Sequence, residues 1–505
     1  MNINDKSALR ECTSCQMCAA VCAKNAIEIR LNKDGFYRPY LDEDKCVDCG
    51  LCTKVCYKFD NDVKVTSVED INKIDVHSAQ YKSDAILEKV TSGGVADALA
   101  KELISRGYVC IGVTYNDELH RAEHKVAYTV SESDAFRGSK YIQSYSLDAF
   151  KTLVKNARTT KFAIFGLPCH IYAAHKFLSL RKQRENCIFI DLFCHGCPSM
   201  LVWNKYEQNI KKQVNYKKFD DVQFRSKVRG WGTFYVVVVV DGVKAFISSP
   251  KQDEFYSLFF SDHVLNDACS DCKLRSTMEY TDIRLGDFWG KRFLNDRKGV
   301  SAVAITSERG QMLFETIKDK FVTAHSDMSE VLVKQSYGKI YHPNLELRKN
   351  MLEALRDDNK TLKDVVDLYY SKQGLTLKAK KLLKTINWYL PFDEYMKLVE
   401  RTNVIVDDAN SYSMAMNGFF SMLKGKLIMG GAEPIANKMY GYENNPIFNI
   451  CPDVDQICDT MIDILNRKDE IEMIGKQGRK FVEKYHDYKQ IAQQYIDIFN
   501  KDLNG

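Results

Sequence analysis

The sequence predicts a multidomain protein that combines α+β and α/β architecture. The chain has 505 residues, enough for roughly three or four domains of ordinary size. Eight of its 17 cysteines fall within the first 56 residues, which marks a small unit of its own. Helix-like and strand-like segments then alternate over about residues 84–345, and a second alternating pattern starts after Pro391.

The N-terminal unit, residues 1–62, contains two cysteine runs with the same spacing, C-x2-C-x2-C-x3-C. The first run is Cys12, Cys15, Cys18 and Cys22, and the second is Cys46, Cys49, Cys52 and Cys56. Three thiolates at this spacing hold three corners of a cubane cluster, while the fourth reaches the other cluster. The pattern therefore predicts two [4Fe-4S] clusters with crossed ligands: Cys12, Cys15, Cys18 and Cys56 for one, and Cys46, Cys49, Cys52 and Cys22 for the other.

This unit resembles a bacterial two-cluster ferredoxin, with one departure. Ala23 and Tyr57 stand where a proline usually follows the fourth cysteine. Zinc sites and disulfides are the alternatives. Zinc sites usually combine paired ligands with a longer gap, which two identical four-cysteine runs match poorly. Because the sequence has no apolar run typical of a signal peptide or membrane span, we expect a cytoplasmic protein with reduced thiols, which argues against disulfides.

The net charge of +5 is mild. It suits an anionic cofactor or an acidic electron-transfer partner, but it is far below the basic excess of nucleic-acid-binding proteins. We therefore expect an electron-transfer protein or a small-molecule redox substrate as partner, and no nucleic acid. The oligomeric state is left open by the sequence.

Residues 63–345 are expected to form a mixed α/β core in two parts, which divide near residues 155–165. Strands are expected at 108–115, 161–165 and 187–193, and helices at 95–105 and 170–180. Asp241-Gly242 joins two β-rich runs, 234–240 and 243–248, into a hairpin.

Residues 346–395 are expected to form a charged helical linker. Within it, the helix expected at 375–390 carries Lys378, Lys380, Lys381 and Lys384, which suits either a solvated face or an anionic membrane surface. The pattern of strand-like and helix-like segments over residues 396–505 then predicts a small Rossmann-like half-domain. Its strands are expected at 403–406 and 426–429, and its helices at 411–423, 453–466, 469–484 and 488–499.

Four motifs between residues 90 and 300 carry candidate chemistry. Thr91-Ser92-Gly93-Gly94 precedes a helix, where glycines allow close approach and free N–H groups favour anions. The other three are Cys169 after a strand, the Cys194–Cys197 segment after the next, and Cys269-x2-Cys272 before 282–290. If these strand-end loops meet, Cys169, Cys194, Cys269 and Cys272 would form a third four-thiolate site, in which Cys197 could substitute for Cys194. Taken singly, each cysteine also fits a buried apolar position.

Five motifs in order resemble one known family: Thr91-Ser92-Gly93-Gly94, Gly138-Ser139-Lys140-Tyr141, Gly166-Leu167-Pro168-Cys169, Cys194-His195-Gly196 and Gly286-Asp287-Phe288-Trp289-Gly290. The family is the beta subunit of coenzyme F420 hydrogenases and dehydrogenases, and the resemblance covers about residues 1–345. It implies an iron–sulfur flavoprotein oxidoreductase with FAD, which passes electrons between clusters and a substrate or second carrier. In well-known members that carrier is the deazaflavin coenzyme F420, but the substrate does not transfer with the fold. Low-potential clusters that must be sheltered from oxygen suggest an anaerobic prokaryote.

The resemblance also suggests roles for single residues. Ser92, Gly93 and Gly94 would meet the flavin, and Lys140 and Tyr141 would bind its anionic side. Arg225 and Lys227 are further phosphate candidates, with solvated strand positions as the alternative. His195 would relay a proton as the catalytic residue, because the ordinary pKa of histidine lies near working pH. The alternative is a histidine that bonds backbone groups beside a cluster.

The C-terminal segment resembles the distal end of a retaining GT-B glycosyltransferase, on residues 424–434, 449–453 and 475–487. Because the acceptor lobe and the paired glutamates of such an enzyme are missing, we expect a packing or docking domain. Glu433 stays a candidate contact for a nucleotide sugar, and the resemblance suggests a surface-polysaccharide setting. Two further functions stay open: a non-catalytic electron-transfer subunit for a separate partner, and a sugar-transfer accessory protein with a regulatory redox half.

Overall fold

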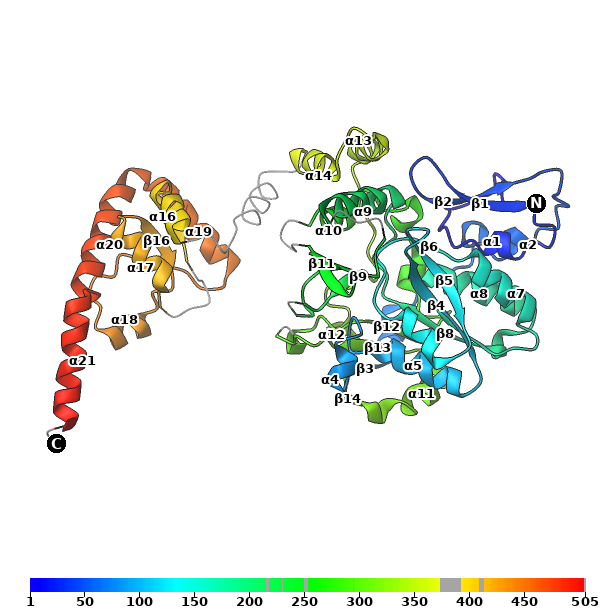
Figure 1. Ribbon diagram of the computed structural model, residues 1–505, viewed down its shortest axis with the longest axis horizontal. Helices are drawn as coiled ribbons and strands as arrows, with labels where there is room; N and C mark the ends of the chain where they lie inside the picture. The colour runs from blue at the N-terminus through cyan, green and yellow to red at the C-terminus, as the bar shows by residue number, and fades with distance from the viewer. Residues whose placement is uncertain are drawn as a thin grey trace. The chain divides into compact units, whose positions relative to one another are not determined.

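The computed structural model describes residues 1–214, 218–228, 230–248, 253–293, 295–372, 392–407 and 413–503 (Figure 1). The chain divides into two compact units, Met1–Thr385 and Ile386–Gly505. No helix in these described ranges combines the length and the apolar character needed to cross a membrane. The basic helix expected at 375–390 lies outside the described residues.

The cysteine runs are held by two one-turn helices and a hairpin. These elements are α1 (Met17–Ala20), α2 (Leu51–Lys54) and the antiparallel strands β1 (Ile27–Leu31) and β2 (Tyr37–Leu41). The residue before each of these helices has a left-handed backbone conformation: Gln16 before α1, at φ 65°, and Gly50 before α2, at φ 73°.

This N-terminal part shares its hydrophobic core with the rest of the first unit, where α1 packs against α7 (Leu147–Asn156) and α8 (Pro168–Leu180). The Gln16 side-chain oxygen accepts hydrogen bonds from the backbone N–H groups of Ser146 and Leu147, which start α7. Residues 1–62 therefore pack into the same compact unit as the residues that follow them.

The centre of the first unit is one nine-stranded mixed sheet with the order β14-β3-β13-β12-β8-β7-β4-β5-β6. Its strands are β3 (Asp75–Tyr81), β4 (Val109–Asn116), β5 (Arg121–Ala127), β6 (Ser144–Tyr145), β7 (Phe162–Phe165), β8 (Cys187–Leu192), β12 (Ile283–Asp287), β13 (Ser301–Ile305) and β14 (Phe321–His325). The four central strands β12, β8, β7 and β4 run parallel. The division expected near 155–165 falls inside this sheet, because β7 pairs with β4 on one side and β8 on the other.

Both faces of the sheet are covered. Phe162 and Ile164 pack with α7 and α8, while Ala163 packs on the opposite face with α5 (Val95–Ser105) and α11 (Glu308–Glu315). This alternation follows from the two-residue repeat of a strand. Short helices α3 (Val68–Ile71), α4 (Asp84–Leu87), α6 (Val130–Ser133) and α12 (Met328–Val331) lie in the connections.

A second, antiparallel sheet in the first unit contains the expected hairpin. It consists of β9 (Asp221–Ser226), β10 (Tyr235–Val240) and β11 (Val243–Ile247), and it packs with α9 (Met200–Val214) and α10 (Glu254–Phe259). Helices α13 (Leu345–Arg356) and α14 (Leu362–Ser371) bury Met351, Leu355 and Val365 in the same core. Residues 345–371 are thus part of the first unit rather than a linker, because their apolar faces have packing partners there.

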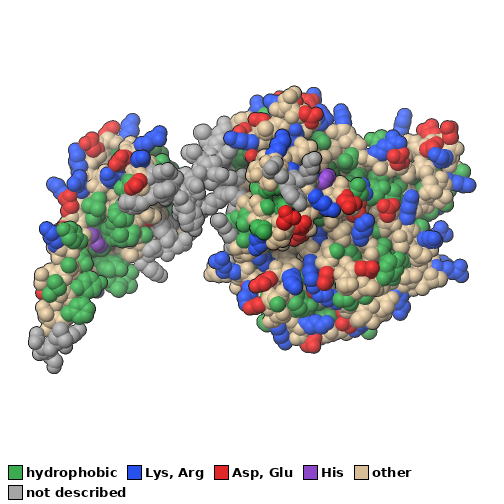
Figure 2. Space-filling view, in the orientation of Figure 1, with side chains coloured by type: hydrophobic (Ala, Val, Ile, Leu, Met, Phe, Trp, Pro, Cys, Tyr) green, Lys and Arg blue, Asp and Glu red, His purple; other side chains and the backbone are tan. Residues whose placement is uncertain are grey.

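The C-terminal unit has three parallel strands, β15 (Val404–Val406), β16 (Leu427–Gly430) and β17 (Phe448–Asn449), in that order. Its helices are α16 (Phe392–Glu400), α17 (Met416–Leu423), α18 (Pro434–Tyr440), α19 (Val454–Asn466), α20 (Ile471–Tyr485) and α21 (Tyr488–Leu503). The helix expected from residue 411 begins at Met416. Hydrophobic side chains gather on the surface of this unit (Figure 2), including Met416, Ile435, Met439 and Phe499.

Candidate functional site

The first cysteine site is a small cavity of about 180 Å³ in the N-terminal part. Its lining includes Cys12, Cys15, Cys18 and Cys56. Burial raises the pKa of Cys18 and of Cys56 above the ordinary thiol value, and the neighbouring thiols raise both pKa values further. This is the crossed set that the spacing predicts, with Cys56 from the second run. Four sulfurs around one enclosed space fit a cubane cluster.

The second site lies at the surface. Burial raises the pKa of Cys52, and the thiols of Cys49 and Cys22 raise it further, so Cys22 lies with the second run. Cys49 is exposed, and the Cys46 sulfur is 3.8 Å from a carboxylate oxygen of Asp48.

The third site gathers five thiols instead of four. They come from the start of α8, the loop after β8 and the segment before β12: Cys169, Cys194, Cys197, Cys269 and Cys272. Burial raises the pKa of Cys169 and of Cys197 well above the ordinary value, and other thiols of this group raise both further. The strand-end loops therefore meet, and Cys197 joins the four cysteines chosen from the sequence.

The three sites lie next to one another. The Cys52 thiol is among the neighbours that raise the pKa of Cys18, which relates the second site to the first. The Cys15 thiol does the same for Cys169, which relates the first site to the third. Tyr57, adjacent to Cys56, packs in a small core with Cys169 and Cys272, and its hydroxyl accepts a hydrogen bond from the Lys273 N–H at 2.9 Å.

A pocket of about 620 Å³ adjoins the third site. Its wall includes Gly166 after β7, residues 192–197 after β8 and Gly286 in β12, so it lies at the carboxyl ends of the parallel strands. Cys194 and Cys197 belong to this wall. The start of α5 lines another side of the pocket. Four aromatic side chains also line it: Phe234, Phe259, Phe260 and Trp289.

The Thr91–Gly94 loop leads into the pocket, although its glycines also have a packing role. Gly94, at φ +92°, starts α5, and a Cβ there would lie 2.4 Å from the Tyr81 ring. A Cβ on Gly93 would lie 2.0 Å from the Ala79 carbonyl oxygen. Ser92 and Gly94 line the pocket, whereas Gly93 is pressed against β3, and the Ser92 hydroxyl donates to the Val300 carbonyl at 2.9 Å.

Lys140 and Tyr141 both line the pocket. The Lys140 ammonium donates to the carbonyls of residues 135–137, the shortest at 2.7 Å from Arg137, and burial lowers its pKa to about 7. The Tyr141 hydroxyl accepts a hydrogen bond from Arg225 at 3.2 Å. These two residues hold the 136–142 segment against the pocket in addition to facing it.

Arg225 and Lys227 are not in the pocket wall; they support it. Arg225 is buried, forms an ion pair with Asp287 and lies 4.2 Å from the Phe234 ring centroid. Lys227 donates to the carbonyls of Leu87 and Ser92 at 2.8 and 2.9 Å, and burial lowers its pKa to about 8. Their charges are already engaged by protein groups, so we interpret them as positioning residues rather than phosphate ligands.

His195 lies in the pocket wall between the two thiols of its loop. Its Nδ1 is 2.9 Å from the Tyr341 hydroxyl and 3.1 Å from the Ser336 hydroxyl, and its Nε2 is 3.0 Å from a carboxylate oxygen of Asp262. The two hydroxyl contacts at Nδ1 fix the ring orientation at the pocket, whereas Nε2 has a close carboxylate but no hydrogen bond among the described residues.

The sequence did not single out two further histidines in the pocket wall, His124 and His170. Their ring centroids are 4.5 Å apart, and burial lowers the pKa of both, that of His170 to about 4. His124 is 3% exposed, and its Nε2 has no hydrogen-bond partner among the described residues. An unpartnered buried nitrogen in a pocket wall points to a polar ligand there. His170 follows Cys169 directly, which was the available sequence signal; His124 carries none.

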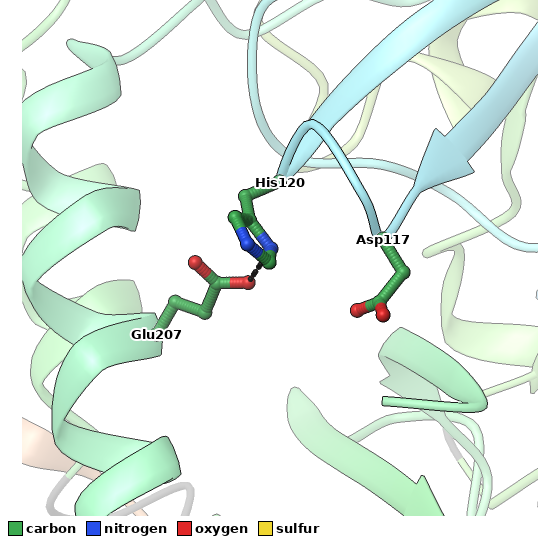
Figure 3. A group of neighbouring side chains, drawn as sticks. All are labelled: Asp117, His120 and Glu207. Atoms are coloured by element: carbon green, nitrogen blue, oxygen red, sulfur yellow. Dashed lines mark ion pairs between the residues drawn. The ribbon is translucent and has the colours of Figure 1, made fainter. Parts of the chain in front are cut away.

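Asp117, His120 and Glu207 form another cluster of possible metal ligands in the first unit (Figure 3). The His120 Nδ1 is 2.9 Å from a Glu207 oxygen. However, the Lys211 ammonium lies 3.1 Å from His120 Nε2 and 3.5 Å from the same Glu207 oxygen. Because the Lys211 ammonium already lies beside His120 and Glu207, we interpret the cluster as an ion-pair network.

Two family models match the chain. Residues 11–58 match a 4Fe-4S dicluster domain, and residues 159–330 match the C terminus of the coenzyme F420 hydrogenase/dehydrogenase beta subunit. Residues 159–330 are thus similar to this oxidoreductase subunit family. The range includes all five thiols of the third site, and the first range includes both cysteine runs. The resemblance seen in the motifs is thereby confirmed for this part of the chain, whereas neither match reaches the C-terminal unit.

Two known proteins are similar to parts of this chain. The uncharacterized protein MJ1349 of Methanocaldococcus jannaschii is 24% identical in an alignment of 215 residues that covers 36% of this chain and 59% of that protein. This chain thus spans about three fifths of that relative's length. A chain of the F420-reducing [NiFe] hydrogenase complex from Methanosarcina barkeri is 19% identical, with a TM-score of 0.37, over 63% of this chain and 94% of that one.

Proposed function

We propose that this protein is an iron–sulfur flavoprotein that carries electrons between a protein partner at its surface and FAD in the pocket. The FAD would exchange them with a small substrate or a deazaflavin-like carrier such as coenzyme F420. One observation carries the proposal: three cysteine sites follow one another from exposed Cys49 to Cys194 and Cys197 in the pocket wall.

Cys46, Cys49, Cys52 and Cys22 would hold the cluster nearest the surface. The next cluster would be held by Cys12, Cys15, Cys18 and Cys56, and the third by the thiols beside the pocket. Clusters transfer single electrons, and FAD when bound supplies the exchange between one-electron and two-electron chemistry. The N-terminus of α5 and the 91–94 loop supply N–H groups for a phosphate. His195 would exchange a proton with the bound ligand, and Asp262 and Tyr341 would hold its ring in place.

The pocket fits a flavin in three respects. It has room for a large planar ligand, an aromatic group in its lining, and an unpartnered nitrogen on His124. The family that matches residues 159–330 is one of hydrogenase and dehydrogenase subunits, which supports redox chemistry at this place.

An electron-transfer subunit without its own substrate is the second candidate, favoured by the exposure of the second cysteine site. The C-terminal unit has parallel strands and helices, an arrangement compatible with the glycosyltransferase resemblance. A docking role of this unit beside a sugar-transfer system is therefore a weaker addition to the flavoprotein function or to the electron-transfer function. The Glu433 side chain is engaged by the Asn449 amide at 3.1 Å.

Flavin reduction through the clusters tests the proposal. Anaerobically purified protein should contain FAD, and a reduced ferredoxin should bleach its absorption. Cys15→Ala removes a thiol between the first and third sites, so the bleaching rate should fall by at least about tenfold. Cys110→Ala, a buried cysteine of β4, is the matched control. Absence of FAD would favour the electron-transfer subunit, and an unchanged rate in Cys15→Ala would contradict the cluster route.

A further inference from the structure

The third site contains one thiol more than a cubane cluster binds. A [4Fe-4S] cluster takes four thiolates, whereas five cysteines converge beside the pocket. Three of them come from outside the loop after β8, namely Cys169, Cys269 and Cys272. The remaining two, Cys194 and Cys197, come from this single loop and compete for one position. The inference drawn from this surplus rests on the proposed function, because it assumes that the site holds a cluster.

The loop is fixed against the Cys269–Cys272 segment between its two cysteines. The buried Arg275 guanidinium donates to the carbonyl of His195, at 3.0 Å, and to the carbonyl of Cys269. A Cβ on Gly196 would lie 3.4 Å from the Cβ of Cys269, so the backbone there approaches the segment closely. These contacts hold the middle of the loop, between Cys194 and Cys197, against the segment that carries Cys269.

A second set of contacts fixes the end of the loop that carries Cys197. The Cys197 carbonyl accepts a hydrogen bond from the Asn266 N–H at 2.8 Å, and the Asn266 carbonyl accepts one from the Cys269 N–H at 2.8 Å. Pro198 pairs with Leu265 in an isolated bridge. These bonds hold Cys197 beside Cys269.

Both thiols also reach the rest of the group. Cys194 and Cys197 are each close enough to Cys169 to interact with its charge, and Cys269 and Cys272 interact with both. Both line the pocket as well. Neither has the surroundings of an isolated core cysteine such as Cys110, whose sulfur contacts the Ala100 carbonyl at 3.6 Å.

We infer that Cys194 and Cys197 are alternative fourth ligands of the third cluster, so that either thiolate can complete it and the other remains a free thiol at the pocket wall. The exchange changes neither the oxidation state nor the charge of the site. One iron–sulfur bond forms as another breaks, and the incoming thiol passes its proton to the leaving thiolate, directly or through water.

Iron content of full-length variants tests this. Wild type should hold about twelve iron atoms, three clusters of about four. Cys194→Ala and Cys197→Ala should each keep about twelve, because the remaining thiol completes the cluster, whereas the double variant should fall to about eight. Cys110→Ala is the control and should keep the wild-type value. The EPR signal of the third cluster should differ between the two single variants, since the fourth ligand comes from a different position.

Several results would overturn the inference. A fall to about eight in one single variant alone would make that cysteine the sole ligand, and a fall in both would make both necessary. Retention of about twelve in the double variant would exclude both as ligands. If wild type itself held only about eight, the third cluster, and with it the proposed route to the pocket, would be wrong. The eight atoms of the N-terminal clusters report correct folding in each variant, because that part shares its core with α7 and α8.

Discussion

The last cysteine of each N-terminal run lies with the other run. Cys22 follows α1, and its thiol raises the pKa of Cys52, while Cys56 follows α2 and its thiol lies near Cys12 and Cys15. A one-turn helix after the third cysteine turns the chain, so the fourth sulfur leaves its own group. Each run therefore supplies one ligand to the cluster that is built on the other run. Substitution of the last cysteine of a run should affect the cluster of the other run.

Cys22→Ala should therefore damage the surface cluster of Cys46, Cys49 and Cys52, with a loss of up to about four iron atoms. The first cluster should keep its EPR signal, because its four thiols remain. Cys56→Ala is the matched variant and should produce the reverse pattern. Loss of the first cluster's signal in Cys22→Ala would show that the ligands are not crossed.

Three basic residues chosen as cofactor ligands are engaged by the protein. Lys140, Lys227 and Arg225 donate to backbone carbonyls, and Arg225 also pairs with Asp287. The partners lie far along the chain in two cases, 135 residues for Lys227 and Ser92, and 62 for Arg225 and Asp287. A sequence motif identifies a basic side chain, but partners that lie far along the chain decide whether its charge is available to bind a cofactor.

The turn into α5 joins the pocket to the sheet. Gly94 has a left-handed backbone and lies against Tyr81 of β3, while the following residues of α5 line the pocket. At the other end of the same helix, Gly107 also has a left-handed backbone, but a Cβ there would meet nothing within 4 Å. The two glycines differ in their surroundings and share their conformation.

Gly94→Ala should lower FAD affinity by at least about tenfold, because the loop must shift away from Tyr81 and carry its N–H groups with it. Iron content should stay at the wild-type value. Equilibrium dialysis of FAD, with Gly107→Ala as the control for backbone strain of about 1–2 kcal/mol alone, measures the effect. Equal FAD affinity in the two variants would mean that this loop does not bind the cofactor.

The chain as a whole consists of a redox unit and a smaller α/β unit. All three cysteine sites and the pocket are in Met1–Thr385. The second unit has its own small cores around Ile428 and Met429 and exposes several large apolar side chains, among them Met439 at 77% and Tyr488 at 73%. Exposed apolar surface of this kind is typical of a contact with another protein.

Deletion of Ile386–Gly505 should leave FAD and iron content nearly unchanged, because each unit has its own core. It should change the association state or the solubility, because the exposed apolar groups are removed with the unit. Cofactor analysis and analytical ultracentrifugation of the shortened chain measure both effects. If FAD is lost, the second unit contributes to the pocket.

The sequence alone determined the local features of this protein. The cysteine spacing predicted which thiols group in the N-terminal part, since a fixed spacing on a short loop limits where each sulfur can lie. The alternation of apolar residues predicted the strands β7 and β8 and the helix α5 within a residue or two, because burial on one or two faces repeats with the period of the element.

Only the tertiary structure decided what depends on distant contacts. It brought Cys197 into the third site, placed His124 at the pocket and engaged Lys227 with Ser92. It also packed residues 1–62 and 345–371 against the central unit, and for residues 345–371 this replaces the linker that the sequence suggested. The physical reason is that burial and partner choice are properties of packed surfaces, and residues that meet there are separated by tens to hundreds of positions along the chain.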